Sequence, residues 1–172
     1  MAVGARKNLN KHDFYPTPEI ATVRFLEQEK FEGEIWEPAC GDGAMSRVIE
    51  RYGYPCKSTD LIDRGYGEGG VDFLRSTYQT ENIVTNPPFI LANKFIHHAL
   101  THASKKVAFL LRLNMLESKG REKLFTKFPF ARLYVHSRRI PFAAKTGSSN
   151  AIAFAWYVWD YAHVGDPVIK FL

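Results

Sequence analysis

The sequence has only two cysteines, Cys40 and Cys56, and their spacing matches neither a metal site nor a disulfide framework. A reduced, intracellular setting is therefore expected. No apolar run approaches the roughly 20 residues that a membrane-spanning helix needs. The polar start of the chain has no apolar segment behind it and so does not resemble a secretory signal. Internal repeats and low-complexity tracts are also missing, which favours one folded domain.

The chain has 172 residues, enough for a single domain with a continuous core, and its hydrophobic fraction of 45% is ordinary for a globular protein. Its formal net charge is +5. This charge favours a polyanionic partner, although charge alone does not identify one. We expect residues 1–12 to form a flexible basic arm and residues 13–172 to form a single domain.

The pattern along the chain alternates between strand-like and helix-like segments. Thr17 is placed to cap a helix that has Pro18 at its first position. The alternation predicts an α/β fold with a largely parallel sheet, and two β-rich runs around a polar loop predict an antiparallel pair near the C-terminus. The expected strands cover Gly33–Glu37, Pro55–Asp60, Asn82–Thr85, Val107–Leu113, Arg132–Ile140 and Ala151–Trp159, and the expected helices Ala44–Tyr52, Leu91–His102 and Arg121–Lys127.

Two acidic positions follow predicted strands, where α/β sheets bind ligands. The first is the turn Glu37-Pro38-Ala39-Cys40-Gly41-Asp42-Gly43, whose small residues allow a ligand to approach the backbone and whose carboxylate can hold an ammonium group. The second is Asp60, which can accept both hydroxyls of a ribose. Each feature by itself is also compatible with an ordinary strand ending.

The strongest signal is Asn86-Pro87-Pro88-Phe89, directly after the strand Ile83–Thr85. The two prolines fix the backbone and remove two N–H donors. Asn86 contributes a carbonyl acceptor, and Phe89 a flat face for stacking. Together these groups can hold a planar amine, with its two N–H groups donated to two carbonyls.

With these residues the chain resembles the S-adenosylmethionine-dependent amino-methyltransferases that methylate adenine N6. The resemblance implies a class I, Rossmann-like methyltransferase fold: a mostly parallel seven-stranded sheet with an antiparallel C-terminal strand and helices on both faces. It implies that Asn86, Pro87, Pro88 and Phe89 are catalytic. It also implies S-adenosylmethionine as the cofactor, with S-adenosylhomocysteine as the product and no metal. The implied cofactor-binding residues are Tyr15, Thr17, Glu37, Pro38, Ala39, Cys40, Gly41, Asp60, Leu61, Asp72, Phe73 and Asn86.

The motif order, with Tyr15-Pro16-Thr17-Pro18 first and the catalytic motif later, resembles the gamma arrangement and small phage-type or prophage-type enzymes. Gamma enzymes that read a DNA sequence usually carry a further recognition domain, and the expectation here is none, with short or loose sequence specificity. The resemblance implies DNA as the partner, with RNA also open, no membrane, and the cytoplasm of a bacterial or phage-infected cell. A monomer and a weak homodimer are both open.

A base inside a duplex must be extruded to reach such a site. Phosphate contacts would come from basic residues around its mouth. The candidates are Arg6, Lys7, Lys11, Arg112, Arg138, Arg139 and Lys145.

Two alternatives remain open. A protein glutamine methyltransferase uses a similar site, because a carboxamide is also a planar amine, but it usually has tyrosine where this chain has Phe89. A non-catalytic module with this fold could also bind nucleic acid. The joint presence of Glu37, Asp60 and Asn86 argues against that module. Trp156 and Trp159 are expected to pack the sheet rather than stack on bases.

Overall fold

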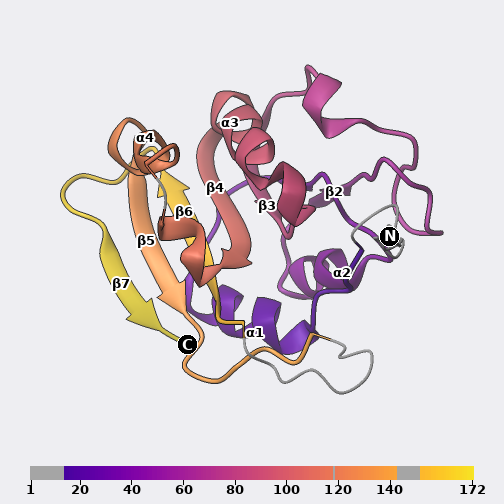
Figure 1. The fold of residues 1–172 in the computed structure, drawn as a ribbon. Helices are drawn as coiled ribbons and strands as arrows, with labels where there is room; N and C mark the ends of the chain where they lie inside the picture. The colour runs from indigo at the N-terminus through magenta and orange to yellow at the C-terminus, as the bar shows by residue number, and fades with distance from the viewer. Residues whose placement is uncertain (1–13, 118, 143–151) are drawn as a thin grey trace, which may run out of the picture.

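The predicted alternation of strands and helices produces one twisted sheet with helices on both faces (Figure 1). The computed structural model describes residues 14–117, 119–142 and 152–172. The described helices are α1 (Glu19–Gln28), α2 (Ala44–Arg51), α3 (Ala92–His102) and α4 (Glu122–Thr126), with short 3₁₀ turns at Phe73–Arg75, Phe89–Leu91 and Leu113–Leu116. The strands are β1 (Ile35–Glu37), β2 (Cys56–Ser58), β3 (Thr80–Thr85), β4 (Ala103–Arg112), β5 (Phe130–Val135), β6 (Phe154–Asp160) and β7 (Val168–Phe171).

Within the described residues the sheet has seven strands in the order β2-β1-β3-β4-β6-β5-β7. Strand β6 runs antiparallel to its neighbours β4 and β5, and the other pairings are parallel. The predicted fold class, a mostly parallel seven-stranded sheet with helices on both faces, is confirmed. The antiparallel strand is the penultimate one. It is followed by the short edge strand β7, which the sequence pattern did not reveal.

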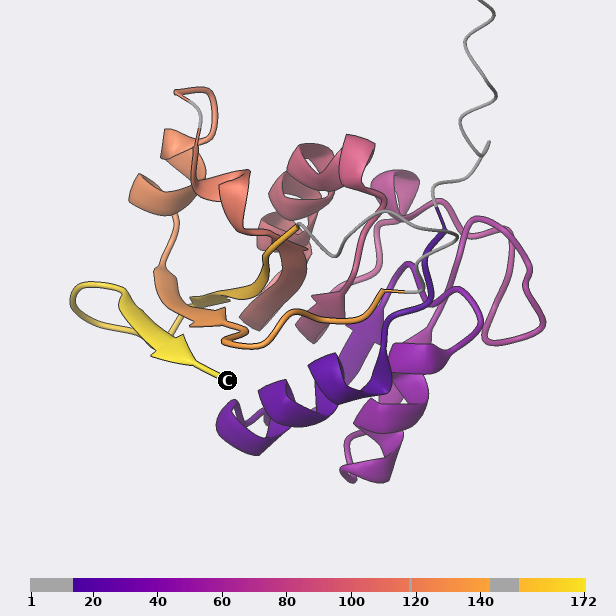
Figure 2. The same cartoon turned by 60° about the horizontal axis from the view of Figure 1, so that its bottom comes forward.

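The two faces of the sheet carry separate parts of the core. Along β4, Val107 and Phe109 pack with α3 and α4, whereas Ala108 and Leu110 pack with α1 and α2. Period-two alternation of a strand buried on both faces requires this division. Figure 2 shows α1 and α2 side by side on one face and α3 on the other. The predicted role of Trp156 and Trp159 in packing is confirmed, because both side chains are fully buried.

Helix α1 is fixed to the sheet through Trp156. The Phe25 ring stacks on Trp156 with centroids 4.1 Å apart, and the indole N–H donates to the Ala21 carbonyl at 3.1 Å. At the other end of α1, the buried Glu29 accepts two hydrogen bonds from Arg132, at 2.6 and 2.9 Å. These contacts position the segment that precedes α1, which contains Thr17.

The predicted cap of α1 is wrong. Pro18 occupies the N-cap position, and no side chain caps the helix there. The Thr17 hydroxyl instead accepts a hydrogen bond from Asn86. A residue that would satisfy a helix end in isolation is thus used in a tertiary contact.

No helix in the described ranges combines the length and the apolar character needed to cross a membrane.

Candidate active site

A cavity of about 400 Å³ opens at the carboxyl ends of three neighbouring parallel strands, β1, β2 and β3. Glu37 ends β1, Asp60 follows β2, and Asn86 follows β3. The segment before α1 closes another side of the cavity. This is the edge of an open α/β sheet where ligands bind. The topology therefore brings together three polar positions that the sequence separates by 23 and 26 residues.

The turn after β1 is shaped by two glycines with left-handed backbones, Gly41 at φ +56° and Gly43 at φ +83°. Gly41 has a second constraint, because a Cβ atom there would overlap with the Phe14 ring. Its N–H donates to Asp60 Oδ2 at 2.8 Å. Glycine is thus required at this position for both its conformation and its lack of a side chain.

Glu37 is buried at the end of β1 and lines the cavity. It accepts a hydrogen bond from the Ser46 hydroxyl, which in turn accepts one from Ser58 at 2.8 Å. Burial raises the pKa of Glu37 to about 8, against the opposite effect of the Ser46 hydrogen bond. Without a cationic partner this carboxyl group is therefore largely protonated at neutral pH.

The Asp60 carboxylate is held by the backbone on both oxygens. Oδ2 accepts from Gly41 N and Oδ1 from Ile62 N, each at 2.8 Å. Leu61 beside it is 57% exposed and lines the cavity. A carboxylate has about four lone-pair positions, so Asp60 keeps acceptor capacity toward the cavity.

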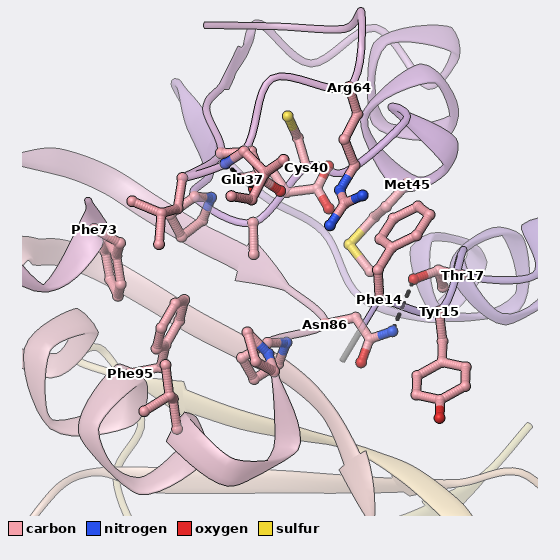
Figure 3. Close-up of a pocket in the computed structure, with 18 of the residues that line it drawn as sticks. Phe14, Tyr15, Thr17, Glu37, Cys40, Met45, Arg64, Phe73, Asn86 and Phe95 are labelled. Atoms are coloured by element: carbon pink, nitrogen blue, oxygen red, sulfur yellow. Dashed lines mark hydrogen bonds between the residues drawn. The ribbon is translucent and has the colours of Figure 1, made fainter. Parts of the chain in front are cut away.

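The Asn86 side chain has one satisfied end and one unsatisfied end (Figure 3). Its Nδ2 donates to Thr17 Oγ1 at 3.0 Å. Its Oδ1 is buried and has no hydrogen-bond partner among the described residues. An unpaired buried carbonyl is unfavourable by roughly 1–3 kcal/mol, so this oxygen is suited to a donor from a ligand.

The residues after Asn86 continue as a turn and a short 3₁₀ helix. Pro87 is buried, and the Pro88 carbonyl accepts from Leu91 N at 2.9 Å. Within the described part of the chain no donor hydrogen-bonds to the Pro87 carbonyl. Among the described residues, neither the side-chain oxygen of Asn86 nor the main-chain oxygen of Pro87 accepts a hydrogen bond.

Phe89 lies among aromatic and cationic side chains. Its ring is nearly parallel to that of Tyr15, with an interplanar angle of 25° and centroids 6.4 Å apart. The Arg112 guanidinium carbon lies 4.7 Å from the Phe89 centroid. Arg112 itself is exposed, so a cationic group stands next to the aromatic wall of the cavity.

The predicted pair Asp72 and Phe73 also reaches the cavity, but each residue has a structural partner. Asp72 Oδ1 accepts from Leu74 N at 3.0 Å, and Phe73 is buried with its edge against Trp36. Phe73 is therefore a core residue that also lines the cavity.

The structure thus gathers all twelve predicted cofactor residues except Gly41 into the cavity lining, and Gly41 lies directly behind Phe14. Other lining residues were missed, among them Phe14, Met45 and Arg64. Phe14 could have been predicted as a site residue, because it directly precedes the Tyr-Pro-Thr-Pro segment. Nothing in the spacing around Arg64 marked it.

Three of the seven predicted nucleic-acid contacts lie within the described residues. Arg112 lies at Phe89, whereas Arg138 and Arg139 are exposed after β5 and do not line the cavity. Arg6, Lys7, Lys11 and Lys145 lie outside the described residues.

The thiols are not activated. Burial raises the pKa of Cys40 to about 12 and that of Cys56 to about 11, so both remain protonated. Across residues 14–117, 119–142 and 152–172, no group of three or more His, Cys, Asp or Glu side chains could hold a metal ion.

Several solved structures are similar to this chain. The modification subunit of a putative type I restriction enzyme from Vibrio vulnificus has a TM-score of 0.61 at 16% identity, over 90% of this chain and 45% of that protein. A putative class I S-adenosylmethionine-dependent methyltransferase from Listeria monocytogenes has a TM-score of 0.64 at 12% identity, over 98% of this chain and 68% of that one. Magnesium protoporphyrin IX methyltransferase from Synechocystis, solved with bound SAM, has a TM-score of 0.58 at 12% identity, over 83% and 77% of the two chains.

No protein-family model matches the sequence, and no curated protein matches it. The chain spans less than half the length of the Vibrio subunit. At these identities the similarity shows a shared fold, that of the class I S-adenosylmethionine-dependent methyltransferases.

Proposed function

We propose that this chain transfers a methyl group from S-adenosylmethionine to the exocyclic N6 amine of adenine in DNA. The observation that carries the proposal is the buried Asn86 Oδ1, which lines the cavity and has no partner among the described residues. It is an acceptor already oriented by Thr17 and available to a planar amine.

The carboxyl groups that line the cavity are suited to the cofactor. Asp60 retains acceptor positions for the two ribose hydroxyls, and the buried Glu37 offers a carboxyl group to an ammonium group. The absence of a side chain at Gly41 leaves room for Phe14 and keeps the turn close-packed. Leu61 and Phe73 line the cavity and would supply apolar contacts for an adenine ring.

The cofactor, when bound, supplies a methyl group carried on a positively charged sulfur. The Asn86 side-chain carbonyl and the Pro87 main-chain carbonyl would each accept one N–H of the target amine. The nitrogen lone pair would then be drawn out of conjugation with the ring and directed at the methyl carbon. As the N–C bond formed, the C–S bond would break with its electron pair left on sulfur, and the nitrogen would lose one proton to solvent. Because positive charge grows on this nitrogen, the two carbonyl dipoles stabilise the transition state more than the ground state.

Phe89 would stack on the target base, and Tyr15 lies nearly parallel to Phe89 on the same side of the site. Stacking offsets part of the few kcal/mol that removing a base from a duplex costs. The net charge of +5 and the exposed Arg112 beside Phe89 favour a nucleic acid over an uncharged protein loop. The restriction-modification subunit among the similar structures is consistent with DNA.

Methylation of DNA, RNA and protein pools with a methyl-labelled cofactor tests this function. We expect label in DNA, recovered by mass spectrometry as N6-methyladenine. Label confined to protein would favour the glutamine methyltransferase, and label confined to RNA would correct the substrate.

Asn86→Ala supplies the matching test of the site. It should reduce turnover by roughly a hundredfold or more, as the loss of one transition-state hydrogen bond does in other enzymes, while cofactor binding is largely retained. Asn93→Ala is the control, because Asn93 is exposed on α3 and does not line the cavity. Equal activity of both variants would contradict the assigned role of Asn86.

A further inference from the structure

Arg64 lies in the glycine-rich segment after Asp60, and its side chain points into the cavity (Figure 3). The guanidinium carbon is 4.1 Å from the centroid of the Phe14 ring. Its Nε is buried and has no hydrogen-bond partner in the described part of the chain. Among the ion pairs of the described residues, none includes Arg64.

Several other described arginines have hydrogen-bond or ion-pair partners. Arg132 donates to both Glu29 and Asp160. Arg47 also lies over an aromatic ring, that of Tyr66 at 4.5 Å, but it is exposed and donates to the Asp42 carbonyl at 2.8 Å. Arg64 therefore differs from these arginines: its side chain is partly buried, and its guanidinium group lies over the Phe14 ring.

The surroundings of Arg64 place it at one end of the proposed cofactor site. Phe14, on which it lies, fills the space directly in front of Gly41 in the turn after β1. Gly41, Phe14 and Arg64 thus form a continuous stack at the glycine turn. In the proposed function this turn receives the amino-acid part of the cofactor, whereas Asp60 receives the ribose.

Asp42 and Asp60 also line the cavity, but neither forms an ion pair with Arg64. Glu37 offers no anion to Arg64, since the two groups form no ion pair and burial favours the protonated carboxyl group. A partly buried guanidinium without a counter-ion is unfavourable, and its planar fork matches a carboxylate in two parallel hydrogen bonds. The amino-acid part of the cofactor carries one carboxylate.

We propose that Arg64 binds the carboxylate of the cofactor's amino-acid part, with Phe14 as the surface that holds the guanidinium in place. This inference rests on the proposed function, because it assumes that the cavity binds S-adenosylmethionine. It makes Arg64 a determinant of cofactor specificity, which discriminates against adenosyl compounds that lack the carboxylate.

The test compares the binding of two ligands to four proteins by calorimetry: the wild type, two Arg64 variants and one control variant. The ligands are S-adenosylhomocysteine and its decarboxylated analogue, S-adenosyl-3-thiopropylamine, which lacks only the carboxylate. We expect the wild type to prefer S-adenosylhomocysteine by roughly ten- to a hundredfold, the usual range for hydrogen bonds to a charged group. Arg64→Met should lose this preference and bind the decarboxylated analogue as the wild type does. Arg64→Lys should recover part of the preference, because it keeps the charge without the fork.

Arg47→Met is the matched control, since it removes an arginine over an aromatic ring outside the cavity lining. It should keep the wild-type preference. Binding of the decarboxylated analogue to Arg64→Met also shows that this variant is folded. If Arg64→Met bound both ligands more weakly by the same factor, the inference would be overturned. It would also be overturned if the variant kept the wild-type preference and bound DNA more weakly, because Arg64 would then be a phosphate contact. If the wild type binds neither ligand, the proposed function itself fails.

Discussion

The Asn86 side-chain amide donates to the Thr17 hydroxyl at 3.0 Å, across 69 positions of sequence. This bond determines which end of the amide faces the cavity. The N–H end is held by the segment before α1, so the carbonyl end is left as an acceptor, buried and without a partner among the described residues. A segment expected to start a helix thus also orients the central residue of the candidate site.

Thr17→Val should reduce kcat by roughly ten- to a hundredfold, the range expected when a positioned group loses its orientation. The replacement keeps the size of the side chain but removes the oxygen that accepts from Asn86. Thr17→Ser restores the hydroxyl and should recover most of the rate. In an Asn86→Ala background Thr17→Val should cause little further loss of kcat, and independent, additive losses would show that Thr17 does not act through Asn86.

Cofactor binding should strengthen as pH rises toward about 8, the pKa to which burial raises the Glu37 carboxyl group. The free site binds a proton on Glu37 below that pH, whereas an ammonium group favours the ionised carboxylate and lowers its pKa. Binding therefore releases a proton, and the affinity should rise by up to about tenfold per pH unit below pH 8. Calorimetry of S-adenosylhomocysteine in buffers of different ionisation enthalpy measures this proton.

Glu37→Gln should bind S-adenosylhomocysteine more weakly, and its binding should not release this proton. The ammonium group of the ligand titrates in the same way with both proteins, so the difference between them isolates Glu37. If the variant and the wild type show the same pH dependence, Glu37 does not receive the ammonium group.

The positions that follow strands were accessible from the sequence because strand ends in an α/β sheet meet at one edge. Glu37, Asp60 and Asn86 were identified in this way, and the cavity contains all three. The sequence did not show which of the predicted site residues are buried in the core. Asp72 and Phe73 matched a cofactor motif, but whether Phe73 packs in the core depends on its contact with Trp36, which no local pattern encodes.

Arg64 and β7 were missed for physical reasons of the same kind. The direction of the Arg64 side chain depends on the path of a glycine-rich segment and on the Phe14 ring, which comes from a part of the chain 50 residues earlier. Strand β7 has only four residues, all exposed, so it lacks the buried alternation that reveals a strand. Its place is determined by parallel pairing with β5.

Gly41→Ala should weaken cofactor binding by about tenfold or more, since a methyl group displaces Phe14 from its contact with Gly41 and adds roughly 1–3 kcal/mol of backbone strain at positive φ. Gly53→Ala is the control, because Gly53 has φ +87° and nothing within 4 Å of an added Cβ atom. It should destabilise the fold by a similar strain while the affinity for S-adenosylhomocysteine stays unchanged. Equal loss of affinity in both variants would assign the effect to strain alone.

Arg132→Met should destabilise the fold by about 3 kcal/mol at pH 7, because it leaves the buried carboxylate of Glu29 without its main partner. Burial alone would raise the pKa of Glu29, but hydrogen bonds from Arg132 and Lys106 outweigh burial and hold that pKa below its ordinary value. A lowered carboxyl pKa contributes stability that is present above the unfolded-state pKa, near 4.3, and is lost as pH falls through the folded-state pKa. Urea denaturation between pH 7 and pH 3 should therefore show a flatter decline for Arg132→Met than for the wild type. Arg51→Met is the control, because it removes the partner of the exposed Glu19 and should change the free energy of unfolding by about 1 kcal/mol at most. An equally small change for Arg132→Met would contradict a structural role for the hydrogen bonds between Arg132 and Glu29.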